Sequence, residues 1–415
     1  MSEKQDKNFE TLLPAARVAV FSSDSKTHKT VNAIADDWRF ARVQFGVVEG
    51  DVAAAIDAYQ NEDTPDLIII QSDDVDESFT DALETLAELC DDGTTALVIG
   101  PKNDVNLYRS LIDMGVEDYL VRPVKPDVLS EAVGRILLEQ VGAGGSQLIA
   151  YVGAKGGMGA SVLAQAAAWG AADVLDQKTI FLDAAGGWST ASVGMGFEPL
   201  ATLSEAARAA ANDDEDSLVR MMHKASDNLH VLASGGEAML DAPVGAKAFE
   251  KLLDTLMVKY PVVIADLSGA SSKLQKAIIA RAHHIHVVST PTLPSLRLAR
   301  AFTQEVKTVR GGSEDSLSLV INMQGLSAAH EVKGSDIAKV MEMTPSAVIP
   351  FDPKVFLAGE SEGRKITQSK DGKAILEQSI LPSLRAILSI KDTGAPSAKT
   401  GFLDGLFGAA KKDKR

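Results

Sequence analysis

The sequence predicts an α/β protein built from two doubly wound domains. Short apolar runs alternate with helix-forming segments along nearly the whole chain, and the connections between them are short. That alternation is typical of parallel sheets with helices on both faces. A glycine-rich stretch, residues 141–146, divides the alternation into two series. Because glycine and serine favour flexible chain, this stretch is expected to be the linker between the domains.

Composition limits the classes of function. The chain has 415 residues, 45% of them hydrophobic and 24% charged, which fits a globular protein of two or three domains. Its formal net charge of -16 argues against extensive nucleic-acid binding, because phosphate contacts need clusters of Lys and Arg. The single cysteine, Cys90, excludes a disulfide framework and is expected to be a buried structural thiol.

The first series predicts a five-stranded domain over residues 17–140, preceded by a flexible leader, residues 1–16. The strands are expected at Val18–Phe21, Ala41–Val47, Asp66–Ile70, Ala96–Ile99 and Asp118–Val121. The helices are expected near Thr30–Trp38, Val52–Tyr59, Phe79–Leu89, Asn106–Met114 and Pro126–Gln140. Five strands that alternate with five helices form a compact doubly wound domain.

The second series predicts a larger α/β domain over residues 147–390. The strands are expected at Gln147–Val152, Thr179–Asp183, Asn228–Ala233, Tyr260–Asp266, Ile285–Ser289, Leu317–Asn322 and Ala347–Ile349. The helices are expected at Val162–Gly170, Leu203–Lys224, Gly245–Lys259 and Leu296–Arg310. Three histidines, His283, His284 and His286, are expected at a strand edge, because no acid or cysteine cluster accompanies them as a metal site would require.

A glycine-rich loop follows the first strand of this second domain. Its residues are Gly153, Ala154, Lys155, Gly156, Gly157, Met158, Gly159, Ala160 and Ser161. A strand, a glycine-rich loop and a helix form a phosphate cradle, in which backbone N–H groups and the helix dipole face the phosphates. The standard pattern G-x-x-x-x-G-K-[ST] is incomplete, since Ala160 occupies the lysine position, whereas Ser161 keeps the hydroxyl expected on Mg²⁺.

Residues 17–138 resemble a response-regulator receiver domain. The resemblance lies in Pro65–Gln71, which matches the strand that ends in the phosphorylated aspartate, and in Gly115–Pro123, which matches the last strand and its Lys-Pro turn. The positions of the receiver's active site are occupied by Ser22, Ser23, Gln71, Gly100 and Arg122. An amide cannot form an acyl phosphate and two serines supply no charge for Mg²⁺. A pseudo-receiver used for binding, dimerisation or localisation is therefore expected, or a domain that only packs on the second one.

Residues 147–390 resemble the MinD/ParA family of deviant Walker A ATPases, whose pattern is K-G-G-x-x-K-[ST]. The resemblance implies ATP and Mg²⁺ as cofactors and a face-to-face homodimer. Lys155 would cross that dimer to the partner's nucleotide, and Asp183 would be the switch aspartate; these two are the catalytic candidates. Asp266 would hold Mg²⁺ through water together with Ser161. Around the base, the resemblance implicates Asn322, Pro350 and Asp352.

Each of these residues also has a simpler interpretation. Lys155 could be a surface lysine, Asp183 and Asp266 could be ordinary acids at strand ends, and Asn322 and Asp352 could serve turn chemistry. Ala160 removes the charge that would bridge two phosphates, and Ala185 stands at the second switch aspartate. Losing such groups costs powers of ten in rate, so ATP binding with weak or absent hydrolysis is expected.

A pseudo-receiver joined to a MinD/ParA-like domain with Gly-Ala-Ser in its loop resembles the CpaE/TadZ family of Tad (Flp) pilus systems. That resemblance implies a spatial regulator, or localisation factor, for pilus assembly, whose partners are proteins of the secretion machinery. The alternative is an active MinD/ParA-type ATPase that works through a membrane-bound or nucleoid-bound cycle. The net charge disfavours a DNA-segregation protein.

The C-terminal residues, 391–415, predict a tether followed by an amphipathic basic tail. As a helix, residues 401–415 place two phenylalanines and two leucines on one face before a lysine cluster, a composition of interfacial helices that resembles the MinD targeting helix. Peripheral membrane contact, a disordered end and docking on the protein's own surface remain open. The N-terminus lacks a signal-peptide core, and no run is long enough to span a membrane. A cytoplasmic location is expected, either free or peripheral at the inner face of the membrane or at the pole.

Overall fold

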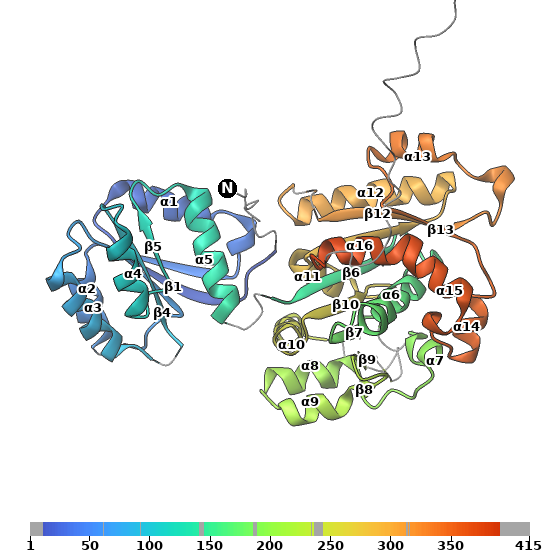
Figure 1. The fold of residues 1–415 in the computed structure, drawn as a ribbon, viewed down its shortest axis with the longest axis horizontal. Coiled ribbons are helices and arrows are strands. Elements are labelled where there is room, and N and C mark those ends of the chain that lie inside the picture. Colours follow the sequence, from blue (N-terminus) through green and yellow to red (C-terminus); the bar gives the residue numbers. More distant parts are fainter. Residues whose placement is uncertain are drawn as a thin grey trace, which may run out of the picture.

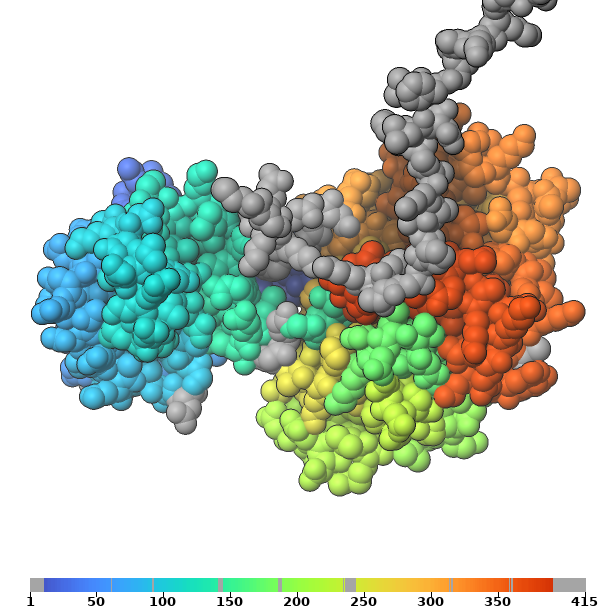
Figure 2. Space-filling model, viewed as in Figure 1, coloured from blue at the N-terminus to red at the C-terminus, as the bar shows by residue number. Residues whose placement is uncertain are grey.

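The computed structural model describes residues 11–390 except 61, 92, 141–144, 186–188, 234, 236–243, 313 and 315. Within this part of the chain, two α/β units lie side by side (Figure 1), and their atoms form two separate lobes (Figure 2). The predicted fold class, two doubly wound domains, is confirmed. Most of the predicted linker, the first part of the leader and the whole C-terminal tail lie outside the described residues.

The first sheet has five parallel strands in the order β2-β1-β3-β4-β5. Its strands are β1 (Ala16–Phe21), β2 (Val43–Val48), β3 (Leu67–Gln71), β4 (Thr95–Gly100) and β5 (Asp118–Val121). Its helices are α1 (Ser25–Ala35), η1 (Trp38–Phe40), α2 (Val52–Tyr59), α3 (Glu77–Leu89), α4 (Val105–Asp113) and α5 (Pro126–Gln140). Helices α1 and α5 pack on one face, and α2, α3 and α4 pack on the other.

Aspartates start the helices of this first domain. The side chains of Asp24, Asp51, Asp76 and Asp104 each accept a backbone N–H in the first turn of α1, α2, α3 and α4. An N-cap of this kind stabilises a helix by about 1 kcal/mol. Because Asp24 starts α1 at Ser25, that helix begins and ends earlier than the predicted Thr30–Trp38 segment.

The second sheet has eight strands in the order β13-β12-β11-β6-β10-β7-β9-β8, of which only β8 is antiparallel to its neighbour. The strands are β6 (Gln147–Gly153), β7 (Thr179–Asp183), β8 (His223–Lys224), β9 (Leu229–Leu232), β10 (Val262–Asp266), β11 (His284–Ser289), β12 (Leu317–Gln324) and β13 (Ala347–Pro350). The central strands are apolar and fully buried, as expected for a sheet covered on both faces.

Two helical layers cover this second sheet. One layer contains α8 (Leu203–Ala211), α10 (Ala246–Lys259), α11 (Ser272–Arg281), α12 (Leu293–Val309) and α13 (Gly334–Met341). The other contains α6 (Ala160–Trp169), η2 (Gly170–Val174), α7 (Ala191–Met195), η5 (Ile366–Gln368), α15 (Lys370–Ile375), η6 (Leu376–Ile380) and α16 (Leu381–Ile387). Shorter elements are α9 (Glu215–Met221), η4 (Ala328–His330) and α14 (Leu357–Glu362). No element beyond Ile349 was predicted, so α14 to α16 are additions.

The structure corrects four predictions. The single helix Leu203–Lys224 is two helices and a short strand, because Asp213 has a positive φ and Asp214 caps α9. The leader does not extend to residue 16, because Leu13 is fully buried in the first core. Cys90 is only half-buried. The three histidines do not lie at a sheet edge, since His284 and His286 belong to β11, an interior strand between β12 and β6, and His283 directly precedes it.

Candidate functional site

The glycine-rich loop leaves the sheet where the strand order reverses. Strand β6 has β10 on one side and β11 on the other. The chain passes from β6 through α6 to β7 on the β10 side, whereas β11, β12 and β13 lie on the opposite side. Ligands of doubly wound sheets bind at such switch points, outside the carboxyl ends of the strands. The loop therefore occupies the ligand-binding position of this fold.

The backbone of the loop requires its glycines. Gly157 and Gly159 have φ angles of 79° and 78°, in the left-handed region that glycine adopts without strain. The backbone N–H of Ala154 donates to the carbonyl of Val288 at 2.9 Å, which ties the start of the loop to β11. After Gly159 the chain enters α6 at Ala160, two residues earlier than predicted. The first turn of this ten-residue helix presents N–H groups and the positive end of its dipole.

The Ser161 hydroxyl donates a hydrogen bond to Asp266, the last residue of β10. Asp266 is 1% exposed, and its Oδ1 also accepts the backbone N–H of Ser268 at 2.9 Å. Burial raises the pKa of Asp266, while the bonds from Ser161 and Ser268 oppose that shift. The predicted Mg²⁺ pair is therefore in direct contact.

Asp183 lies beside Asp266. The two aspartates are register partners of the adjacent strands β7 and β10. Asp183 is fully buried, and its Oδ1 accepts the N–H of Ala185 at 3.0 Å. Two buried carboxylates on neighbouring strands make this edge of the sheet a place that favours a cation. Among the residues that the structure describes, no cluster of three or more His, Cys, Asp or Glu side chains could hold a metal directly.

Positive charge is scarce at the loop. Ala160, at the position of the standard lysine, is 3% exposed and packs in the core with Met158. Lys155 is exposed, and within the described ranges its side chain has no ion pair or hydrogen bond. An exposed lysine with no partner in its own subunit can reach a ligand or a second chain.

Asn322 holds the loop from the far side of β11. Its Nδ2 donates to the carbonyl of Met158 at 2.8 Å, and a side chain at position 159 would overlap that amide. This loop contact was not predicted, since the sequence pattern suggested a bond to adenine. Asp352 forms a turn instead: its Oδ1 accepts the N–H groups of Lys354 and Val355. Pro350 ends β13, the edge strand.

The residues present fit a magnesium nucleotide. The loop exposes Gly156 and Gly157 with open space where a side chain would lie, so backbone can approach phosphate closely. Ser161 and Asp266 are the hydroxyl and carboxylate that Mg²⁺ prefers, with water completing its shell. When bound, Mg²⁺ neutralises phosphate charge.

The corresponding position in the first domain is filled by its own side chains. Ser22 Oγ donates to Gln71 Oε1 at 2.9 Å, and both residues are buried. Arg122 pairs with Asp73 at 2.5 Å. At Gly100, an added side chain would overlap the ring of Tyr119. Ser23 is exposed. Because Gln71 is a neutral amide and is bonded to Ser22, the acceptor position of a receiver holds no carboxylate that could form an acyl phosphate.

Comparison with known proteins gives two kinds of match. The chain is similar to the pilus assembly protein CpaE from Caulobacter crescentus CB15, at 34% identity over 31% of this chain and 97% of that one, with a TM-score of 0.30. It is also similar to CpaE2 from Sinorhizobium meliloti 1021, at 39% identity over 29% of this chain and 98% of that one, with a TM-score of 0.29.

The other match concerns fold. A ParA family ATPase from Chlorobium tepidum TLS matches 58% of this chain and 99% of its own length at 18% identity, with a TM-score of 0.51. At this identity the match shows a shared fold. No family model and no curated protein sequence matches the chain. Among the described helices, none combines the length and the apolar character needed to cross a membrane.

Proposed function

We infer the function from one premise: this chain belongs to the CpaE family of pilus assembly proteins. We propose that it is an ATP-binding spatial regulator, a localisation factor that marks where the pilus machinery of the Tad (Flp) type assembles. The observation that carries this proposal is the loop itself. Ser161 and buried Asp266 are bonded together beneath the left-handed glycines, while Ala160 fills the lysine position.

Nucleotide binding rests on four groups. The N–H groups of residues 156–161 face the phosphates, Ser161 and Asp266 hold Mg²⁺ through its inner and outer shells, and Lys155 supplies the cation. The exposure of Lys155 supports this role, because an exposed lysine can extend to the nucleotide of a second copy across a homodimer.

Hydrolysis is weak or absent in this proposal. Without a lysine at position 160, no fixed cation of the same subunit neutralises charge that develops between the two terminal phosphates. Ala185 offers no carboxylate to orient water. The output of the site is then nucleotide-dependent assembly, and the machinery proteins of the pilus are the partners. The proposal includes a cytoplasmic location and contact of residues 401–415 with the membrane surface.

Calorimetry of the full chain tests the site. Mg²⁺-ATP is expected to bind, and EDTA is expected to abolish binding. The Ser161→Ala variant loses a hydrogen bond to a charged group and an Mg²⁺ ligand, which lowers affinity roughly tenfold to a hundredfold. Ser335→Ala, an exposed serine on α13, is the matched control. The proposal would be contradicted if the measured ATP affinity were the same with and without Mg²⁺ and were unchanged by Ser161→Ala.

The second candidate is an active MinD/ParA-type ATPase, which the exposed Lys155 favours. A phosphate-release assay separates the two. Brisk turnover that Lys155→Ala reduces by orders of magnitude would establish the enzyme. If the protein binds ATP but releases phosphate no faster than buffer alone, the result supports the regulator. A liposome co-sedimentation assay with and without residues 401–415 tests the membrane contact.

A further inference from the structure

The two domains meet at the edge of the second sheet opposite the glycine-rich loop. Helix α11 starts after β10, at the loop edge, and ends immediately before β11, at the other edge. Three carbonyls at its C-terminal end face the contact. The carbonyl of Ala280 accepts the N–H of Leu12 at 3.0 Å, and the carbonyls of Ile279 and Ala282 accept the guanidinium of Arg310 at 2.9 and 2.8 Å.

Arg310 also reaches the first domain. This fully buried side chain lies with its guanidinium carbon 5.6 Å from the centre of the Trp38 ring, which belongs to η1. The next residue, Gly311, approaches the same ring so closely that any side chain would overlap it. A cation between a helix C-terminus and an aromatic face is attracted by both. The end of α11 is thus connected to η1 through one arginine.

A charge cluster forms the second half of the contact. Arg42 of the first domain lies 3.1 Å from Glu250 and 3.9 Å from Asp254, both on α10. Asp254 also pairs with Arg281, the last residue of α11, which is 2% exposed. Burial and the neighbouring Arg281 lower the pKa of Arg42. Two arginines from two domains thus share one carboxylate.

The ion pairs of Arg42 and Arg281 make this part of the contact polar. A cleft of about 790 Å³, lined by Arg42, Glu250 and Asp254 among others, runs beside the charge cluster. Interfaces between domains of one chain permit relative motion unless they are large and hydrophobic. We name this interface the docking contact, defined by Leu12, Trp38 and Arg42 of the first domain and by the residues given above on α10, at the end of α11 and directly after α12.

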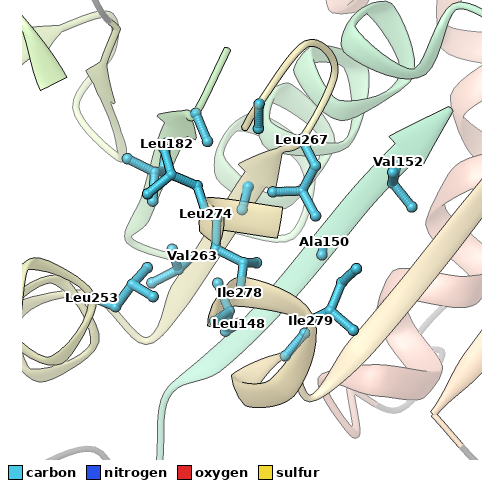
Figure 3. Packing of buried hydrophobic residues seen from close by; sticks show 14 of the residues in the cluster. Leu148, Ala150, Val152, Leu182, Leu253, Val263, Leu267, Leu274, Ile278 and Ile279 are labelled. Atoms are coloured by element: carbon cyan, nitrogen blue, oxygen red, sulfur yellow. The ribbon is translucent and has the colours of Figure 1, made fainter. Parts of the chain in front are cut away.

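At its other end, α11 is joined to the nucleotide-site aspartate. Asp266 is followed by the turn 267–270, and Gln275 of α11 donates to the carbonyl of Leu267 at 3.3 Å. Figure 3 shows how the apolar face of α11, with Leu274, Ile278 and Ile279, packs against β6 and β10. Ten helical residues span about 15 Å and do not compress. A shift at the turn therefore moves the whole helix against the sheet.

We propose that α11 couples the nucleotide site to the docking contact, so that the receiver-like domain senses whether ATP is bound. This regulation rests on the proposed nucleotide binding. Coupling between two sites is reciprocal. If ATP changes the equilibrium between the docked and undocked domains by some factor, then undocking the domains changes the affinity for ATP by the same factor. No residue of the docking contact touches the glycine-rich loop, so an effect on affinity must pass through the second domain.

Two measurements on the full chain test the coupling. In the first, calorimetry compares Mg²⁺-ATP affinity of the wild type, Arg42→Ala and the control Arg109→Ala, an exposed arginine on α4. The Arg42→Ala variant is expected to differ from wild type by about fivefold or more, the lower end of typical couplings, and the control is expected to match wild type.

In the second, Trp169→Phe and Trp188→Phe leave Trp38 as the single tryptophan, and its acrylamide quenching is measured with and without Mg²⁺-ATP. A change in quenching supports the coupling and does not depend on the folding of Arg42→Ala. The coupling is wrong if wild type, Arg42→Ala and Arg109→Ala bind ATP with equal affinity and the quenching of Trp38 is also unchanged. That result would not contradict the nucleotide site itself. Failure of the wild type to bind ATP overturns the proposed function as well.

Discussion

Acid is expected to destabilise the second domain through two histidines at the start of β11, His283 just before the strand and His284 as its first residue. His283 Nδ1 accepts the backbone N–H of Leu148 at 3.0 Å, so protonation at this nitrogen breaks a bond to β6. Burial, followed by Arg281 and Arg310, lowers the pKa of His283 from 6.5 to about 4. Burial and Arg310 lower the pKa of His284 to about 4 as well.

The sign and size follow from proton linkage. Between pH 6.5 and 4 the unfolded chain binds more protons than the folded domain, so stability is complete above pH 6.5 and declines as pH falls through this window. A histidine whose pKa is 6.5 in the unfolded chain and about 4 in the folded domain lowers the free energy of unfolding at pH 5 by up to about 2 kcal/mol relative to pH 8. His283 and His284 together reach up to about 4 kcal/mol.

Urea unfolding at pH 8 and pH 5 checks this, with hydrogen exchange of β6 and β11 as the signal for the second domain. His283→Asn supplies a carbonyl acceptor for Leu148 and does not titrate, so the loss between the two pH values shrinks by up to about 2 kcal/mol. His330→Asn, an exposed histidine, is the control and keeps the full loss. If His283→Asn loses as much stability as wild type, the assigned role of this histidine is wrong.

Further substitutions test the site and the core. Ala160→Lys restores the missing cation and is expected to raise ATP turnover by tenfold or more in a phosphate-release assay; unchanged turnover would show that the lysine position is not limiting. Asn322→Ala removes the bond to Met158 and is expected to weaken ATP binding roughly threefold to tenfold by calorimetry. Leu13→Ala empties a fully buried position and is expected to cost about 2–5 kcal/mol in urea unfolding, whereas a flexible leader would show no loss. Gly100→Ala, whose added carbon overlaps the Tyr119 ring, is expected to cost about 1–3 kcal/mol in the first domain, read from its thermal transition.

Much of the site could be predicted because its signal is local. The loop between Gly153 and Ser161 follows an apolar strand directly, and Asp183 and Asp266 each end such a strand. Parallel strands bring their carboxyl ends to one edge, so strand ends that are far apart in sequence meet. The register of β7 and β10 makes the two aspartates neighbours.

Residues whose roles depend on distant partners were missed. Nothing near Asn322 in the sequence indicates that its amide holds Met158, because the two are brought together only by the order of the three strands β12, β11 and β6. The three histidines were assigned to an edge, since the sequence does not say that β12 and β13 lie outside β11. A buried polar strand residue has the same local pattern as an exposed one.

The sequence determined the fold class, the position of the glycine-rich loop and the absence of its lysine, because alternation and strand-loop-helix order are local properties of the chain. Tertiary structure decided that Ser161 bonds to Asp266 and that Leu13 is buried rather than free. It also decided that Arg310 joins the end of α11 to Trp38. Each of these contacts joins segments that are far apart in the chain and that propensity and pattern treat separately, and the contact of Arg310 with Trp38 also requires both domains.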